Sequence, residues 1–180
     1  VITNINQQSY TADWSIPQSI FNLMSGGTNY VSVKVYDNAG NINISTDVFY
    51  VLKDTQTPAI TNNQSGDDVW RNTNSGVYDV DFYDNGQSKL NKVQIKVMSG
   101  ANQSGTLITD WSDVITNINQ QSYTTNWQIP QSIFDLMQSG TNYVSVRVYD
   151  NAGNYTDRVD AFYVLKDVDI PVITNNQLGD

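Results

Sequence analysis

Apolar and polar residues alternate along one stretch near the C-terminal end of the chain. Val144, Val146 and Val148 are each separated by one more polar residue. This period of two is typical of a β-strand that buries one face. The sequence 150–154, Asp-Asn-Ala-Gly-Asn, then predicts a turn, because Asp and Asn side chains bond the nearby backbone and Gly153 tolerates a positive φ. The stretch therefore predicts a strand that ends in a tight turn.

The same stretch occurs earlier in the chain. Residues 29–41 are almost identical to residues 142–154, which follow 113 positions later. Residues 1–67 align with residues 114–180 without a gap, and 49 of the 67 positions are identical. Internal similarity at a fixed period is typical of tandem structural repeats. We therefore expect a repeat with a period of 113 residues.

The repeat period predicts where the domains begin and end. In both copies a predicted strand ends in Tyr-Val-Leu-Lys-Asp, and a short polar stretch with Pro58 or Pro171 follows. Such stretches commonly join domains, and proline is tolerated at the start of a strand. We expect a complete repeat at 55–167, the C-terminal half of a repeat at 1–54, and the first strand of another at 168–180.

Several other segments of the complete repeat show the same alternation. Residues 77–83 and 92–98 are separated by a turn sequence that begins at Asp84, so we expect them to pair as a β-hairpin. Further strands are expected at 59–64, 106–111, 114–119, 122–129 and 159–165. The candidate core residues are those in phase on these strands: Tyr78, Val80, Phe82, Val93, Ile95, Val97, Tyr123, Trp127, Ile129, Phe162 and Val164.

One short helix is expected at residues 131–138, because the preceding residue is a proline, which suits the start of a helix. Ile133, Phe134 and Met137 form its apolar stripe, and Gly140 is suited to a left-handed C-terminal cap. About seven short strands, with this helix before the penultimate one, predict an all-β sandwich.

Composition excludes several classes of function. The chain has no Cys and no His, and all its acidic residues are Asp, so thiol nucleophiles, imidazole bases and ordinary zinc sites are absent. A hydrolase could use only pairs of aspartates, such as Asp67 with Asp68 or Asp79 with Asp81, and solvated charges are the simpler interpretation. We therefore expect no enzyme.

The net charge of −9 argues against a nucleic-acid partner, which would require clustered Lys and Arg. No apolar run is long enough to span a membrane, and the chain does not open with a signal sequence. We expect it to be an internal part of a longer protein.

Residues 140–154, with Trp127 upstream and Pro171-Val-Ile downstream, resemble the tandem immunoglobulin-like (Big or fibronectin-III-like) repeats of large bacterial surface proteins. In that family a Tyr usually points inward at the start of the penultimate strand. Here the phase of the valines places Asn142 inward and Tyr143 outward. The resemblance implies a structural module of an extracellular stalk, spacer or adhesin fibre, with neighbouring copies of the repeat as partners.

Aspartates near the predicted domain junctions are candidate ligands for calcium, which takes six to eight oxygens from such groups. The alternative is that Asp serves local hydrogen bonding in turns, and no Asp-x-Asp-x-Asp-Gly loop is present. No other cofactor is expected. The candidate ligands are Asp54, Asp67, Asp68, Asp150, Asp167 and Asp169.

Trp70 lies in the polar loop 65–76 and is the candidate for stacking on a glycan or surface ligand. This carbohydrate-binding or adhesive role is the alternative to the structural one, and anchoring of the loop to its own domain is the simpler interpretation of the residue. Trp127 and its equivalent Trp14 are expected in a core. Lys166 is expected to lie at a solvated strand end, which argues against an intramolecular Lys–Asn crosslink.

Residues 1–54 contain late strands of a repeat without the early ones. The inner face of these strands, which includes Val31, Val33, Val35, Phe49 and Val51, is therefore expected to be uncovered. We expect neighbouring copies to complete it, through continuous chain or through strand addition at open edges.

Overall fold

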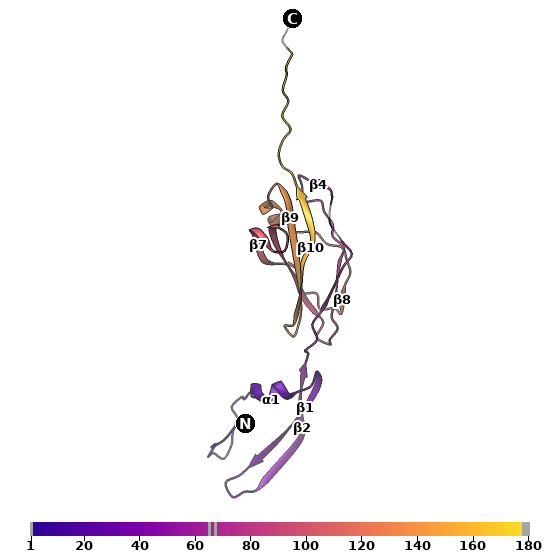
Figure 1. The fold of residues 1–180 in the computed structure, drawn as a ribbon. Helices are drawn as coiled ribbons and strands as arrows, with labels where there is room; N and C mark the ends of the chain where they lie inside the picture. Colours follow the sequence, from indigo (N-terminus) through magenta and orange to yellow (C-terminus); the bar gives the residue numbers. More distant parts are fainter. Residues whose placement is uncertain (1, 65, 67, 178–180) are drawn as a thin grey trace. The chain divides into compact units, whose positions relative to one another are not determined.

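The computed structural model describes residues 2–64, 66 and 68–177. The chain divides into two compact units, Val1–Thr55 (unit 1) and Gln56–Asp180 (unit 2). Both units are mostly β-strand with one helix, α1 (Gln18–Leu23) in unit 1 and α2 (Gln131–Leu136) in unit 2 (Figure 1). With six residues each, the helices in the described part of the chain are too short to cross a bilayer.

Unit 1 is a β-hairpin with α1 before it. Strands β1 (Gly27–Tyr36) and β2 (Ile42–Lys53) pair antiparallel. In the turn between them the Asp37 carboxylate accepts hydrogen bonds from the backbone N–H groups of Ala39 and Asn41, at 2.9 and 2.7 Å. The side-chain amide of Asn41 also donates to Asp37, at 2.7 Å, and this bond, followed by the backbone bond from Asn41, holds the pKa of the Asp37 carboxyl below its usual value.

Unit 2 contains two sheets. The first has the strand order β4-β10-β9-β6-β7, and the second β3-β5-β8. The bounds are β3 Ala59–Asn62, β4 Trp70–Arg71, β5 Val80–Tyr83, β6 Leu90–Gly100, β7 Ser104–Ile115, β8 Ser122–Tyr123, β9 Gly140–Asp150 and β10 Tyr155–Lys166.

The core of unit 2 lies between these sheets and includes side chains from both of them and from α2. Three aromatic residues meet at its centre. The ring of Tyr78 stacks on that of Phe162 with centroids 4.2 Å apart, and Trp127 contacts both rings. Trp127 Nε1 also donates to the carbonyl of Val80. Side chains that were predicted to point inward are buried. Val80, Ile95, Val144 and Phe162, for example, are at most 1% exposed, which confirms the prediction for their strands.

The predicted hairpin of 77–83 with 92–98 is wrong. Strand β5 pairs with β3 and β8, whereas β6 pairs with β7 and β9 in the other sheet. The turn between them bends the chain across the core, because the Asp84 carboxylate accepts hydrogen bonds from the backbone N–H groups of Gly86 and Lys89, at 2.8 and 2.6 Å. The backbone of Asp84 itself donates to the Gln121 carbonyl beside β8.

Three smaller expectations differ from the structure. The predicted strand 106–111 lies within β7, whose pairing with β6 is repeatedly shifted, whereas the predicted strand 114–119 is mostly wrong, because β7 ends at Ile115 and residues 116–119 are not strand. The predicted strand 122–129 reduces to β8 and an isolated bridge between Trp127 and Tyr78. Helix α2 ends at Leu136, because Met137 is already extended, and the positive φ of Gly140 begins β9 instead of capping the helix.

Two buried polar side chains tie the end of α2 to the strands that follow. Asn142 is fully buried and donates to the carbonyls of Gln138 and Gly140, at 2.9 and 3.1 Å, which confirms its predicted inward position. Lys166 is 7% exposed, so its prediction as a solvated residue is wrong. Its Nζ donates to the carbonyls of Phe134, Asp135 and Met137, at 2.9 to 3.2 Å, because the last helical carbonyls lack helical partners.

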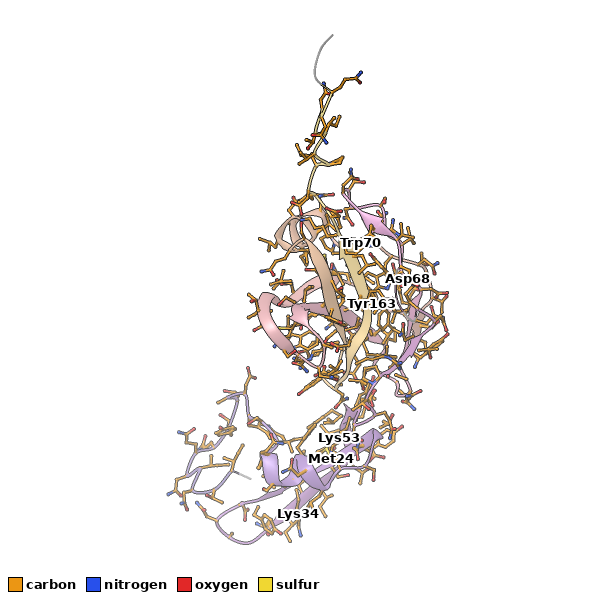
Figure 2. The ribbon with its side chains drawn as sticks, turned by 45° about the horizontal axis from the view of Figure 1, so that its top comes forward. Met24, Lys34, Lys53, Asp68, Trp70 and Tyr163 are labelled. Carbon is orange, nitrogen blue, oxygen red and sulfur yellow. The ribbon has the colours of Figure 1, made fainter. Side chains whose placement is uncertain are left out.

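The equivalent residues of unit 1 make the same bonds. Asn29 donates to the carbonyls of Ser25 and Gly27, at 2.9 and 3.1 Å. Lys53 donates to three carbonyls at the end of α1, including that of Met24 at 2.9 Å (Figure 2). The local structure around each helix end is therefore the same in both units.

Unit 1 has no core of its own. None of its described residues is buried. The expectation of an uncovered inner face is confirmed in part, since Val35 and Phe49 are 58% and 37% exposed. Val31, Val33 and Val51 are half-buried. Trp14, expected in a core, is 46% exposed, because the described part of unit 1 has no second sheet to cover it.

Candidate functional site

Within unit 2, the predicted calcium ligands do not all lie together. In unit 2, Asp150 ends β9, whereas Asp167 follows Lys166, which pairs with Gly140 at the other end of β9. Eleven strand residues separate these ends by roughly 35 Å, so Asp150 and Asp167 cannot share an ion within one unit. Asp54 is a half-buried residue after β2 in unit 1, and Asp67 lies outside the described residues.

Asp150 has a second buried aspartate beside it, which the sequence did not single out as a site residue. A carboxylate oxygen of Asp84 lies within 4.8 Å of one of Asp150, and both residues are at most 5% exposed. Asp150 accepts hydrogen bonds from the backbone and side-chain N–H groups of Asn154, both at 2.8 Å. These donors, with those that bond Asp84, hold the two carboxylates as turn-stabilising groups. The signal that could have identified Asp84 is its position in a turn directly after a strand, which is the position that Asp150 also has.

Asp68 lies on the surface of unit 2 beside β10. Its carboxylate accepts a hydrogen bond from the hydroxyl of Tyr163, and Figure 2 shows the two residues on the same part of the unit. This bond fixes the loop before β4 onto the outer side of the sheet. Asp68 therefore has a structural partner within its own unit.

Trp70 lies in a pocket of about 460 Å³ together with two of the predicted calcium ligands. Its strand β4 runs parallel to the end of β10, with Trp70 opposite Leu165. The Asp167 N–H donates to the carbonyl of Arg71 at 3.0 Å, which brings the segment after β10 to this loop. The pocket is lined by Trp70, Arg71, Asn72 and residues 167–171.

The chemistry of this pocket combines one aromatic surface with carboxylates. Trp70 is 58% exposed, and the exposed residues Asp167 and Asp169 lie beside it. An exposed indole can stack on the apolar face of a sugar ring, and carboxylates can accept hydrogen bonds from its hydroxyls. The structure thus brings the predicted ligand residue Trp70 together with Asp167 and Asp169, and leaves Asp68 and Asp150 elsewhere.

A second aromatic cluster, on the outer face of the five-stranded sheet, was not predicted. The guanidinium of Arg147 lies over the rings of Trp111 and Tyr155, at 4.3 and 4.5 Å from their centroids. Asp157 accepts two hydrogen bonds from it, at 2.5 and 2.7 Å, and this pairing is the main cause that raises the pKa of Arg147 above its usual value. Arg147 holds these rings together on the sheet, and Tyr155 remains 49% exposed. The sequence signal that could have predicted this cluster is strand alternation, which places Arg147 on the outward face of its strand.

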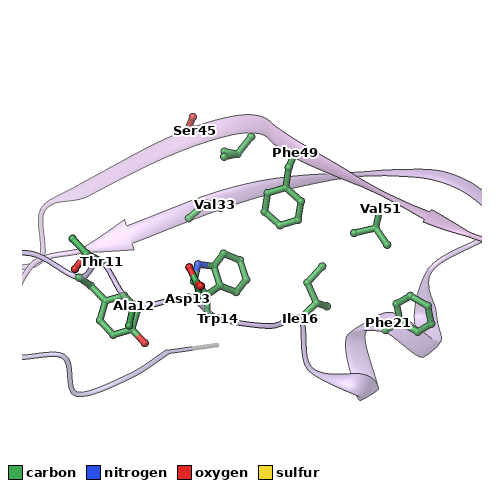
Figure 3. A pocket seen from close by; sticks show the side chains of 12 residues that line it. Thr11, Ala12, Asp13, Trp14, Ile16, Phe21, Val33, Ser45, Phe49 and Val51 are labelled. Carbon is green, nitrogen blue, oxygen red and sulfur yellow. The ribbon is translucent and has the colours of Figure 1, made fainter.

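Unit 1 contains a hollow lined mainly by apolar side chains. It has a volume of about 820 Å³ and lies between the hairpin and the segment before α1 (Figure 3). Its apolar lining faces inward as Figure 3 shows, and Phe49 and Trp14 meet edge to face with centroids 5.9 Å apart. We call this hollow the unit 1 groove; it is lined by Tyr10, Thr11, Ala12, Asp13, Trp14, Ile16, Phe21, Val33, Ser45, Val48, Phe49 and Val51.

Comparison with known proteins gives no relative from which a role could be transferred. No protein-family model matches the chain, and no curated protein matches it.

Proposed function

We propose that the chain is a structural part of a tandem array of immunoglobulin-like β-sandwiches with a period of 113 residues. In this proposal the array forms the stalk, spacer or adhesin fibre of a long extracellular bacterial surface protein. Each complete repeat contributes length and rigidity, and its partners are neighbouring copies of the same repeat.

The observation that carries the proposal is that unit 1 repeats the second half of unit 2 in detail. In unit 1 the hairpin begins with Gly27 opposite Lys53, and in unit 2 with Gly140 opposite Lys166. Both hairpins contain a register shift at the same place, beside an aspartate with positive φ, Asp47 or Asp160. Proteins that use many copies of one module for the same mechanical task have this kind of local identity.

The strand order of unit 2 supports the immunoglobulin-like part of the proposal. Two mainly antiparallel sheets share one core, and strands that are distant in sequence, β6 and β9, are neighbours in the sheet. Such Greek-key connections between two packed sheets are typical of immunoglobulin-like sandwiches. Asn142 bonds the backbone a few residues upstream, as the corner tyrosine of some of these domains does.

The distribution of polar groups supports a structural role. The buried Asn142 and Lys166 bond to backbone carbonyls, and the buried Asp84 and Asp150 accept from turn N–H groups. Each of these side chains is used for holding the fold. In the proposed module, these buried polar groups stabilise the fold and take no part in catalysis.

The proposal is tested by the length of designed arrays. Proteins with one, two and four copies of residues 56–168 should show a maximum dimension, measured by small-angle X-ray scattering, that grows in proportion to the number of copies. Compact arrays whose dimension grows only with the cube root of mass would contradict a spacer. Antibodies against the chain should also label intact source cells without permeabilisation, and labelling only after permeabilisation would contradict an extracellular role.

The Trp70 pocket favours a second candidate function, recognition of a glycan or surface ligand. The observation in its favour is an indole that is 58% exposed beside carboxylates at the same end of unit 2. Glycan-array binding by the chain that is lost in Trp70→Ala and retained in Tyr155→Ala, an exposed aromatic residue elsewhere on the unit, would support it. Equal signals from the two variants would contradict it.

A further inference from the structure

The unit 1 groove has an apolar surface whose equivalent in unit 2 is completely covered. Trp14 and Phe49 are 46% and 37% exposed, whereas Trp127 and Phe162, their equivalents 113 residues later, are 5% and 1% exposed. The residue types are the same, so the difference arises from what packs on them. The segment that covers these residues in unit 2 therefore indicates what kind of segment could bind in the unit 1 groove.

In unit 2 the covering residues come from the first half of the repeat. Tyr78 stacks on Phe162, and its backbone N–H and carbonyl exchange hydrogen bonds with those of Trp127, at 2.8 and 3.2 Å. Trp127 Nε1 donates to the carbonyl of Val80. These contacts combine ring stacking with backbone pairing, so they define both the chemistry and the register of the covering strand.

The neighbouring strand of unit 1 has an edge that is also paired in unit 2. Strand β9 pairs with β10 on one side and with β6 on the other, where Val144 lies opposite Val97 and Val148 opposite Val93. Among the described residues, the equivalent strand β1 pairs with β2 alone. A free strand edge next to an apolar surface is the arrangement that binds an added β-strand.

We propose that the unit 1 groove binds another copy of the first half of the repeat, a segment with the sequence of residues 56–113. The copy of β6 pairs with β1, so that its Val97 lies opposite Val31. The copy of Tyr78 stacks on Phe49, and the indole N–H of Trp14 donates to the carbonyl of the copy of Val80. The proposal depends on the internal equivalence of the two units, and it holds independently of whether the array is a stalk.

The test uses the whole 180-residue chain labelled with 5-fluorotryptophan and an unlabelled peptide of residues 56–113. Fluorine NMR resonances are assigned with single Trp→Phe variants. On titration, the Trp14 resonance should move towards that of Trp127, because the peptide gives Trp14 the surroundings of Trp127. The resonances of Trp70, Trp111 and Trp127 should stay in place, since unit 2 already contains its own first half.

Matched variants separate this mode of binding from simple apolar adhesion. A peptide with Tyr78→Asp and Phe82→Asp should bind at least about tenfold more weakly, because both side chains belong to the face that enters the groove. A peptide with Asp79→Asn and Asp81→Asn, on the opposite face of the same strand, should bind as the unmodified one does. In the chain, Phe49→Asp should abolish the shift, and Leu52→Asp, outside the groove, should preserve it.

Several results would overturn the proposal. These are an unmoved Trp14 resonance, equal binding by the two variant peptides, or movement of the Trp127 resonance, which would mean exchange of strands with unit 2. A Trp14 shift that grows with the concentration of the chain alone would identify a second unit 1 as the occupant. If the peptide is insoluble, residues 56–113 can be fused ahead of Val1 through a flexible Gly/Ser linker, and an unshifted Trp14 in that protein would equally refute the proposal.

Discussion

Lys166 shows how a single residue can connect a helix to a sheet in this fold. Its Nζ donates to three carbonyls at the end of α2 and lies 4.9 Å from the centre of the Phe134 ring. A cation at a helix C-terminus also interacts favourably with the helix dipole. The residue thus joins the end of β10 to a helix of only six residues, which would be marginal without tertiary contacts.

Replacement of Lys166 by Met should destabilise unit 2 by about 1–3 kcal/mol, because buried carbonyls lose their charged donor. The matched variant is Lys53→Met, which removes the same three bonds in a unit that has no buried core. Urea unfolding followed by the near-ultraviolet signal of the core aromatics measures both. Equal effects of the two variants on this transition would contradict the role assigned to Lys166.

Asp113 provides a small pH-dependent contribution to stability. Hydrogen bonds from Lys92 and then from Gln94 lower the pKa of the Asp113 carboxyl below its usual value. A folded-state pKa below the unfolded one gives stability that is present above the unfolded pKa and is lost as the pH falls through the folded pKa. The side chains of Asp113 and Lys92 are 44% and 32% exposed, so the contribution should stay below about 1 kcal/mol.

We therefore expect Asp113→Asn to lower the stability of unit 2 slightly at pH 7 and to have no effect well below pH ~4, the ordinary Asp pKa. Urea unfolding at several pH values measures the difference. In a Lys92→Met background the effect of Asp113→Asn should shrink. A difference that persists unchanged at low pH would show that charge is not its cause.

For single residues, the sequence could predict which side chains point inward, because inward and outward side chains alternate along a strand. The alternation of Val144, Val146 and Val148 was sufficient to place Asn142 inward, and burial confirmed it. Lys166 was missed, because it is inward by the same parity as Val164 but a lysine after a strand ordinarily indicates solvent. Its partners are backbone carbonyls of α2, which leave no pattern in side-chain sequence.

At the scale of elements, the strands were easier to predict than their partners. Both β5 and β6 have the expected inward side chains, yet they lie in opposite sheets. Their alternation is the same whether they pair with each other or face each other across a core, since one face is buried in both cases. The turn at Asp84 is also held by Gln121, which is distant in sequence. The Asp84 N–H donates to the Gln121 carbonyl, and the Gln121 side-chain amide donates to the Asp84 carbonyl.

The contrast between equivalent elements gives a direct energetic test. Phe162→Ala in β10 removes a fully buried ring that contacts Tyr78 and Trp127, so it should destabilise unit 2 by about 3–5 kcal/mol. The equivalent change in β2, Phe49→Ala, should leave the same transition almost unchanged. Calorimetry of the two variants measures the difference. A large effect of Phe49→Ala would mean that unit 1 has an ordered core in solution.

On the scale of the whole molecule, calcium remains a proposal about junctions between repeats. The predicted ligands in unit 2 lie towards the two ends of its strands, Asp150 at one and Asp167 with Asp169 at the other. We expect a protein with two complete repeats to gain thermal stability in calcium, and a single repeat, residues 56–168, to gain little. Chelation should reverse the gain. Equal responses of the two proteins, or none in either, would refute calcium at the junctions.

In the proposed array, unit 2 contains a self-sufficient repeat, whereas unit 1 is half of one. Hydrogen exchange of the dilute 180-residue chain, shown to be monomeric by sedimentation, distinguishes the complete repeat from the half. Amides of residues 142–166 should be strongly protected, because β9 and β10 belong to a sheet with a buried core, and those of residues 29–53 should exchange quickly. Equal protection of the two segments in the monomer would show that unit 1 is stable without the first half of a repeat, and would contradict the account.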